Sequence, residues 1–365
     1  MGNISIVGVH CFGCTACQYI CPEQCIQMKE DSKGFKYPSI DDDMCTQCGL
    51  CKDVCPYLSG YIGGELYPRT QAIAVKHKKE NIRQNSSSGG AFTAISDWMI
   101  NIGGVVYGAG YDENMRVCHQ RATSRGQRDK LRGSKYVQSD LQEVFVDVNK
   151  DIQNKKQVLF VGTPCQIAGL KNVLGQDYEN LFLVDIICHG VPSPKIFREY
   201  LKQLEQEKKE KIVDCKFRDK SEGWRNLTLS IDFNSSKIVL NSSESSFYNL
   251  FLNNTMLRPN CYECPYTNFN RPSDLTIGDF WGIENTFIDF DDNKGISLVL
   301  VNTTKGKHLI QNIGVEIEMK ETTHEQCMQD RLHSPTAPHE HSDSFWEDYG
   351  AKGFAYVAEK YGVLT

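Results

Sequence analysis

The sequence predicts a small α+β module over residues 1–56, followed by an α/β domain that has a mainly parallel sheet and a small antiparallel subdomain. One cysteine string occurs twice within the first 56 residues, which sets this segment apart from the rest of the chain. Between residues 71 and 210, apolar strands alternate with helical patterns, as is typical of a parallel sheet with crossover helices. Residues 212–240 instead alternate as antiparallel strands do.

The duplicated string is C-x2-C-x2-C-x3-C-P. Its first copy comprises Cys11, Cys14, Cys17, Cys21 and Pro22, and its second comprises Cys45, Cys48, Cys51, Cys55 and Pro56. Three thiolates at two-residue gaps hold three irons of a 4Fe–4S cubane, and the fourth cysteine reaches the other cubane. Zinc is the alternative, but a zinc site takes four ligands and does not require this spacing twice. The spacing therefore predicts a bacterial-type ferredoxin domain with one cluster on Cys11, Cys14, Cys17 and Cys55 and another on Cys45, Cys48, Cys51 and Cys21.

The rest of the chain divides by composition and periodicity. Residues 57–70 are rich in Gly, Tyr and Pro and are predicted to be a linker. Residues 71–210 are predicted to be the first part of the α/β domain, with strand–turn–helix units at 72–101, 157–174 and 181–207. Residues 211–365 are expected to add the antiparallel subdomain, a C-x2-C pair and the remaining α/β elements.

Four further cysteines predict a third metal centre. Two successive predicted strands each lead into a cysteine, and the ends of parallel neighbours meet at the carboxyl edge of a sheet. A C-x2-C pair lies downstream, so four ligands are available. We predict a third 4Fe–4S cluster on Cys165, Cys188, Cys261 and Cys264. The alternative is that the first two are small core residues and the last two bind zinc with other ligands. Cys25 and Cys215 are predicted to be packing residues.

Two segments have the residue types that an anionic ligand needs. The run from Ser86 to Gly90 opens a predicted helix, and its hydroxyls and backbone N–H groups suit the phosphate of a nucleotide-type cofactor. The alternative is an ordinary helix cap. Residues 116–135 hold seven basic residues against one acid, Asp129. We expect Arg128 and Arg132 in this tract to help hold an anionic cofactor or substrate, although most charge runs are solvated faces.

Several ordered motifs together resemble those of the coenzyme F(420) hydrogenase/dehydrogenase beta-subunit family. They are Ser86 to Gly90, Lys135 to Ser139, Gly162 to Gln166, Cys188 to Pro192 and Asp274 to Trp281. The resemblance spans nearly the whole chain, including the fused ferredoxin domain. It implies an FAD-binding α/β domain with its own iron–sulfur centre on the four later cysteines. It also implies FAD contacts from Ser86, Ser87, Ser88, Gly89, Gly90, Ser134, Lys135, Tyr136 and Thr163.

The expected function is that of an iron–sulfur flavoprotein oxidoreductase. Electrons would pass between a low-potential carrier of the ferredoxin type, the 4Fe–4S clusters, FAD and a two-electron substrate or deazaflavin-like coenzyme. One alternative is an electron-transfer subunit of a larger oxidoreductase complex with no substrate of its own, and another is a zinc-binding interaction protein. No catalytic acid or base is assigned.

Composition limits the partners and the compartment. The formal charge of −6 gives no overall attraction to nucleic acid, so the expected partners are ferredoxin or another oxidoreductase subunit and a small-molecule substrate. No apolar run approaches the length of a membrane span, and residues 1–6 lack the features of a signal peptide. We therefore expect a cytoplasmic protein, where many thiols favour metal ligation over disulfides.

Overall fold

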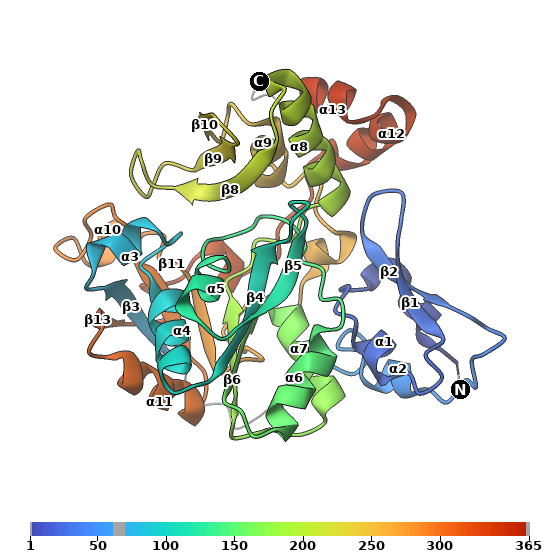
Figure 1. Cartoon of the computed structure of the whole chain (residues 1–365), viewed down its shortest axis with the longest axis horizontal. Coiled ribbons are helices and arrows are strands. Elements are labelled where there is room, and N and C mark those ends of the chain that lie inside the picture. The colour runs from blue at the N-terminus through green and yellow to red at the C-terminus, as the bar shows by residue number, and fades with distance from the viewer. Residues whose placement is uncertain (1, 61–69, 363–365) are drawn as a thin grey trace.

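The computed structural model of the chain describes residues 2–60 and 70–362 (Figure 1). Most of the linker predicted at residues 57–70 lies outside the described residues. The N-terminal part contains η1 (Ile4–His10), α1 (Ala16–Ile20), β1 (Ile26–Glu30), β2 (Lys36–Ile40) and α2 (Leu50–Asp53). β1 and β2 pair as an antiparallel hairpin. Each cysteine string runs into one of the two short helices, so Cys17 lies in α1 and Cys51 lies in α2.

A mixed eight-stranded sheet forms the centre of the second part. Its strands are β3 (Gln71–His77), β4 (Val105–Tyr111), β5 (Val117–Ala122), β6 (Val158–Gly162), β7 (Leu181–Ile186), β11 (Leu275–Asp279), β12 (Ser297–Val301) and β13 (Ile317–Thr322). They lie in the order β13-β3-β12-β11-β7-β6-β4-β5. The four central strands β11, β7, β6 and β4 are parallel, whereas β5 on one side and β12, β3 and β13 on the other pair antiparallel.

The prediction of a mainly parallel sheet is therefore correct for the centre and wrong for the flanks. Both faces of the sheet are covered over its inner strands, so the antiparallel strands β3 and β12 are buried and apolar, as the parallel strands are. One face packs on α4 (Ala91–Asn101) and α11 (Thr304–Ile313), and the other packs on α6 (Val144–Gln153) and α7 (Pro164–Leu174). Short connections are formed by α3 (Glu80–Gln84), α5 (Arg125–Asp129), α10 (Ile283–Thr286), η2 (Pro259–Glu263) and η3 (Asp330–Leu332).

A three-stranded antiparallel sheet forms the predicted subdomain. It consists of β8 (Ile212–Asp219), β9 (Thr228–Phe233) and β10 (Lys237–Asn241), with β9 in the middle. Its apolar face packs on α8 (Pro194–Lys208), α9 (Ser246–Leu252), α12 (Ser342–Lys352) and α13 (Phe354–Tyr361). Figure 1 shows this layer above the carboxyl edge of the large sheet.

The N-terminal part contacts the rest of the chain along α7, at the start of α8 and around η2 (Figure 1). At the first, α1 packs on α7, where Gly169 lies so close to Cys14 that an added Cβ would be 2.9 Å from Cys14 Sγ. At the second, the tip of the β1–β2 hairpin meets the start of α8, where the Ser193 hydroxyl donates a hydrogen bond of 2.5 Å to the Lys33 carbonyl. Arg198 adds an ion pair of 2.7 Å with Glu30.

No helix in the described part of the chain has the length and hydropathy that crossing a bilayer would require.

Candidate iron–sulfur centres and cofactor cavity

Cys11, Cys14, Cys17 and Cys55 lie together in the N-terminal part, and each is at most 9% exposed. Burial raises the pKa of Cys14, Cys17 and Cys55, and the charges of the neighbouring thiols raise it further. Four buried thiols this close cannot all ionise unless positive charge lies between them, because each thiolate repels the others. An iron–sulfide core provides that positive charge, so the donor set fits one cubane.

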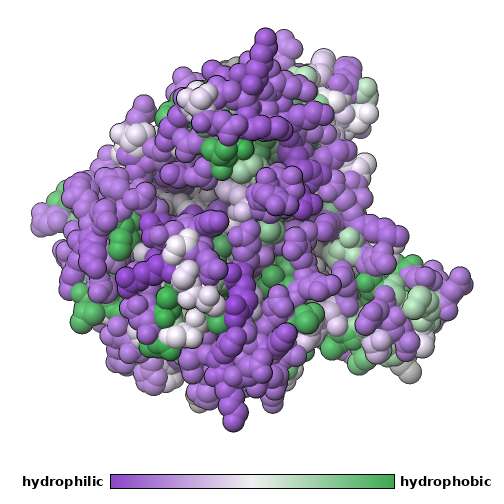
Figure 2. Space-filling model, viewed as in Figure 1, coloured by the Kyte–Doolittle hydropathy of each residue, from purple (hydrophilic) through white to green (hydrophobic). Residues whose placement is uncertain are grey.

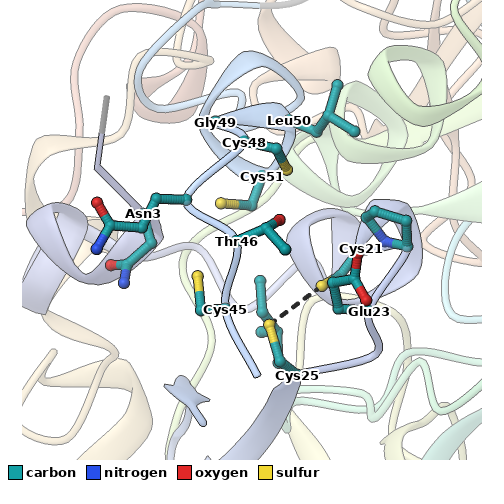
Figure 3. Close-up of a pocket in the computed structure, with 13 residues that line it drawn as sticks. Asn3, Cys21, Glu23, Cys25, Cys45, Thr46, Cys48, Gly49, Leu50 and Cys51 are labelled. Atoms are coloured by element: carbon teal, nitrogen blue, oxygen red, sulfur yellow. Dashed lines mark hydrogen bonds between the residues drawn. The ribbon is translucent and has the colours of Figure 1, made fainter. Parts of the chain in front are cut away.

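A second group of cysteines lines a small cavity between the turn that follows α1, the start of β1, and the segment that leads into α2 (Figure 3). Cys21, Cys45, Cys48 and Cys51 contribute to its wall, and Cys48 is exposed to solvent. Cys25 lines the same cavity, with its Sγ 3.4 Å from Cys21 Sγ. Cys25 is buried, as a packing residue would be, but it packs directly beside the proposed ligands.

The four later cysteines come together from three segments. Cys165 lies in the first turn of α7, which Thr163 and Gln166 begin with a reciprocal capping box. Cys188 follows β7, and Cys261 lies in η2. Burial raises the pKa of Cys188, and the charges of Cys261, Cys165 and Cys264 add to that effect. Burial likewise raises the pKa of Cys165 to about 11 and of Cys261 to about 12.

Within the described residues, no three Cys, His, Asp or Glu side chains form a group that could hold a single metal ion. A cubane does not need such a group, because each of its four irons takes its own cysteine.

A buried ion pair fixes the segment that carries Cys264. Arg271 is 1% exposed and lies 3.0 Å from Asp185, which is fully buried in β7. The same guanidinium donates hydrogen bonds to the carbonyls of Tyr266 and Ile186. The loop after Cys264 is therefore tied to the strand that leads to the other proposed ligands.

Replacing Asp185 with Asn is expected to cost about 3–5 kcal/mol of stability, because Arg271 would keep a buried charge without its partner. Anaerobic thermal unfolding would show this as a melting temperature lower by several degrees. The matched control is Asp214→Asn, which removes an exposed pair 3.8 Å from Lys216 and should change little. Equal melting temperatures for the two variants would contradict the expectation.

A cavity of about 730 Å³ lies between the carboxyl edge of the large sheet and the three-stranded sheet. Figure 2 shows the surface hollowed between these two layers. Eight of the nine residues expected to contact FAD line it, namely Ser86, Ser87, Ser88, Gly90, Ser134, Lys135, Tyr136 and Thr163. The exception is Gly89, where a Cβ would be 2.2 Å from the Val75 carbonyl oxygen, so this glycine allows close contact with the sheet. Cys188 also lines the cavity, so the cavity lies beside the third cysteine group.

The serines in front of α4 have different roles. The hydroxyls of Ser86 and Ser88 donate to the carbonyls of Ile82 and Ile296, at 2.7 and 2.8 Å, and so brace the loop. The Ser87 hydroxyl accepts the Ser134 N–H at 2.7 Å, which joins the two predicted contact segments.

The Lys135 side chain contacts the backbone just before it in the sequence. Its ammonium group donates to the carbonyls of Lys130, Arg132 and Gly133, and burial lowers its pKa to about 7. It therefore holds the turn that precedes Tyr136.

The basic tract at residues 116–135 is largely neutralised by its own Asp129 and by three acids outside the tract. Its ion pairs are Arg116 with Asp112, Arg121 with Asp151, Arg125 with Asp97, Arg128 with Asp97 and Asp129, and Arg132 with Asp129. Arg128 is 2% exposed and does not line the cavity, so the expectation that it holds an anion is wrong. Arg132 does line the cavity.

Sequence reasoning missed a buried cationic side chain at the cavity. Arg218 is buried, pairs with Asp279 and lies 5.2 Å from the ring of Trp281. Trp281 stacks on Trp224 with ring centroids 5.0 Å apart. The string from Asp274 to Trp281 contains two of these residues, but no local pattern in the sequence distinguishes Arg218.

Comparisons with known proteins match two regions of the chain. Residues 10–58 match the 4Fe-4S dicluster domain, and residues 155–325 match the C terminus of the coenzyme F420 hydrogenase/dehydrogenase beta subunit. A curated relative is the F subunit of F(420)H(2) dehydrogenase from Methanosarcina mazei, 24% identical over 207 residues that cover 53% of this chain. The chain spans 58% of that relative's length. A solved structure of the F420-reducing [NiFe] hydrogenase complex from Methanosarcina barkeri aligns with a TM-score of 0.45 and 15% identity, covering 71% of this chain and 82% of that chain.

The fold and the cysteine groups thus define an iron–sulfur electron-transfer protein, with a 4Fe–4S dicluster domain joined to an α/β domain. The match over residues 155–325 agrees with the family that the sequence motifs predicted.

Proposed function

We propose that the chain is an iron–sulfur flavoprotein oxidoreductase. Electrons would pass between a low-potential carrier of the ferredoxin type, three 4Fe–4S clusters, FAD and a two-electron substrate or deazaflavin-like coenzyme. Helix α7 is the observation that supports this most. Its first turn carries Cys165 next to Thr163 at the large cavity, and one turn later Gly169 packs on Cys14 of the N-terminal part. One helix thereby connects a cysteine group of each part with the cavity.

The proposed cluster ligands are those derived from the spacing. The eight cysteines of residues 1–56 would hold two clusters, and Cys165, Cys188, Cys261 and Cys264 would hold the third. Burial disfavours the charged thiolates in the first and third groups, so a cationic core is the partner that their chemistry requires. The exposed Cys48 would place the second cluster where an external carrier can approach.

FAD is the proposed ligand of the large cavity. When bound, it would exchange single electrons with clusters and two electrons, as hydride, with a substrate. The N-terminus of α4 would receive the phosphates, because backbone N–H groups and the helix dipole favour negative charge there. Residues 71–210 would supply most contacts, and residues 211–365 would close the cavity with Tyr248, Phe251 and Trp281.

The relative's name raises a second possibility. A dehydrogenase of F(420)H(2) makes a deazaflavin the first coenzyme to test, and a relative that is one of several subunits favours a chain that works within a larger oxidoreductase. In that case the chain would transfer electrons without a substrate of its own.

Anaerobic purification with iron, sulfide and flavin analysis tests the main proposal. About twelve irons per chain are expected from three cubanes, together with one FAD. A screen of deazaflavin and other two-electron acceptors with the dithionite-reduced chain follows. Turnover by the purified chain alone would exclude the pure electron-transfer role, and a colourless protein without iron would refute both.

Replacing Arg132 with Gln is expected to weaken FAD binding about tenfold or more, because a charge-assisted hydrogen bond to an anion contributes about 1.5–3 kcal/mol. Flavin fluorescence titration measures the dissociation constant. Arg116→Gln is the control, since Arg116 pairs with Asp112 away from the cavity. The same affinity in both variants would show that Arg132 does not contact the flavin.

A further inference from the structure

Arg258 is a buried cation whose hydrogen bonds all go to neutral groups. It is 1% exposed. Its guanidinium donates to the carbonyls of Cys11 and Lys36 at 2.6 and 3.0 Å, and to the Gln138 side-chain oxygen at 3.0 Å. The ring of Tyr37 lies 4.3 Å from its central carbon. In the parts of the chain that the structure describes, none of its nitrogens forms an ion pair with a carboxylate.

Two other buried arginines, unlike Arg258, each pair with a carboxylate. Arg271 pairs with Asp185 at 3.0 Å, and Arg128 pairs with Asp97 at 2.7 Å. A buried charge is costly unless an opposite charge lies near it, and neutral carbonyls offset only part of that cost. Arg258 therefore requires negative charge from another source.

The cysteine groups lie on both sides of this guanidinium. On one side it bonds the carbonyl of Cys11, and its Nη1 lies 3.0 Å from the position of a Cβ added to Gly13, within the first cysteine string. On the other side, the Arg258 carbonyl accepts the N–H of Cys261 at 2.8 Å. Arg258 thus forms hydrogen bonds with residues of two of the three cysteine groups.

We infer that Arg258 is the shared counterion of the first and third clusters and raises the reduction potentials of both. The inference rests on the proposed function. A cubane with its four thiolates is anionic and gains a further negative charge on reduction, so a fixed cation beside it stabilises the reduced form more than the oxidised form. The second cluster, at Cys45, Cys48 and Cys51, makes no contact with Arg258 and would not share the effect.

Potentiometric titration followed by electron paramagnetic resonance tests this in the holoprotein. In Arg258→Gln, the reduced-to-oxidised ratio of the first and third clusters at a given potential should fall at least tenfold, which equals about 59 mV for one electron. The second cluster should be unchanged. Arg258→Lys, which keeps the charge, should recover most of the shift. Signals are assigned by comparison with Cys165→Ala and Cys48→Ala proteins.

A second variant keeps the test decisive if Arg258→Gln does not fold. Gln138→Glu places a carboxylate beside Arg258 with almost no change of shape, so it should lower the same two potentials. Arg128→Gln, which removes a buried arginine away from the cysteines, should leave all three unchanged. Unshifted potentials in Gln138→Glu, or a loss in Arg258→Lys equal to that in Arg258→Gln, would overturn the inference. A wild-type protein without iron would instead refute the proposed function.

Discussion

Replacing Cys165 with Ala is expected to lower the iron content from about twelve to about eight atoms per chain, because the proposed third cubane of four irons would lose a ligand. The other two clusters should remain, since their cysteines lie in a separate part of the chain. Iron and sulfide analysis after anaerobic purification measures the loss. The resonance signals of the remaining clusters show whether those sites are intact.

Cys118→Ala is the matched control for this experiment. Cys118 is also buried, in β5, but its sulfur only accepts a weak hydrogen bond from Gln120. Its replacement should leave about twelve irons. An unchanged iron content in Cys165→Ala would show that the third cluster is absent or is held by other residues.

Replacing Gly169 with Ala is expected to cost about 1–3 kcal/mol and to slow electron transfer between the two parts of the chain. The added Cβ would be 2.9 Å from Cys14 Sγ and 3.0 Å from Cys14 Cβ, so α7 and the first cysteine string must separate. Anaerobic thermal unfolding measures the stability. Stopped-flow absorbance with a reduced carrier measures the rate at which the proposed flavin and third cluster become reduced.

Gly350→Ala provides the comparison for Gly169→Ala. Gly350 also lies in a helix, α12, but a Cβ there would meet no atom within 4 Å. Alanine should be neutral or stabilising at this position by up to about 1 kcal/mol, because glycine is the poorer helix former. Electron transfer as fast in Gly169→Ala as in Gly350→Ala would argue against a path through α7.

The ferredoxin domain was predictable because its information is local. The spacing from Cys11 to Cys55 determines which thiols can share a cubane, and the family comparison confirms the 4Fe-4S dicluster domain. The strand–turn–helix units were predictable for the same reason. In each unit the spacing of the apolar residues changes from that of a strand to that of a helix, and turn residues lie between the two. Strand direction was not, because β3 and β12 are as apolar as the parallel strands although they pair antiparallel.

Three other features depend on tertiary contacts and could not be predicted. The acids that neutralise the basic tract, such as Asp97 and Asp151, lie in other elements and are remote in sequence. Gly169 is an ordinary helix residue until α1 packs against it. Arg258 has no motif of its own, and its importance follows only from its place between two cysteine groups.

The attachment of the N-terminal part at several places has a consequence for electron transfer between the proposed clusters. Contacts with α7, the start of α8 and Arg258 fix this part on the rest of the chain, so it does not act as a carrier that moves on a flexible linker. Transfer between the proposed first and third clusters would then need no diffusive motion of the protein. Higher solvent viscosity would therefore slow only the encounter with an outside partner. In a crowded medium that encounter, and not an internal rearrangement, would be the step whose rate changes.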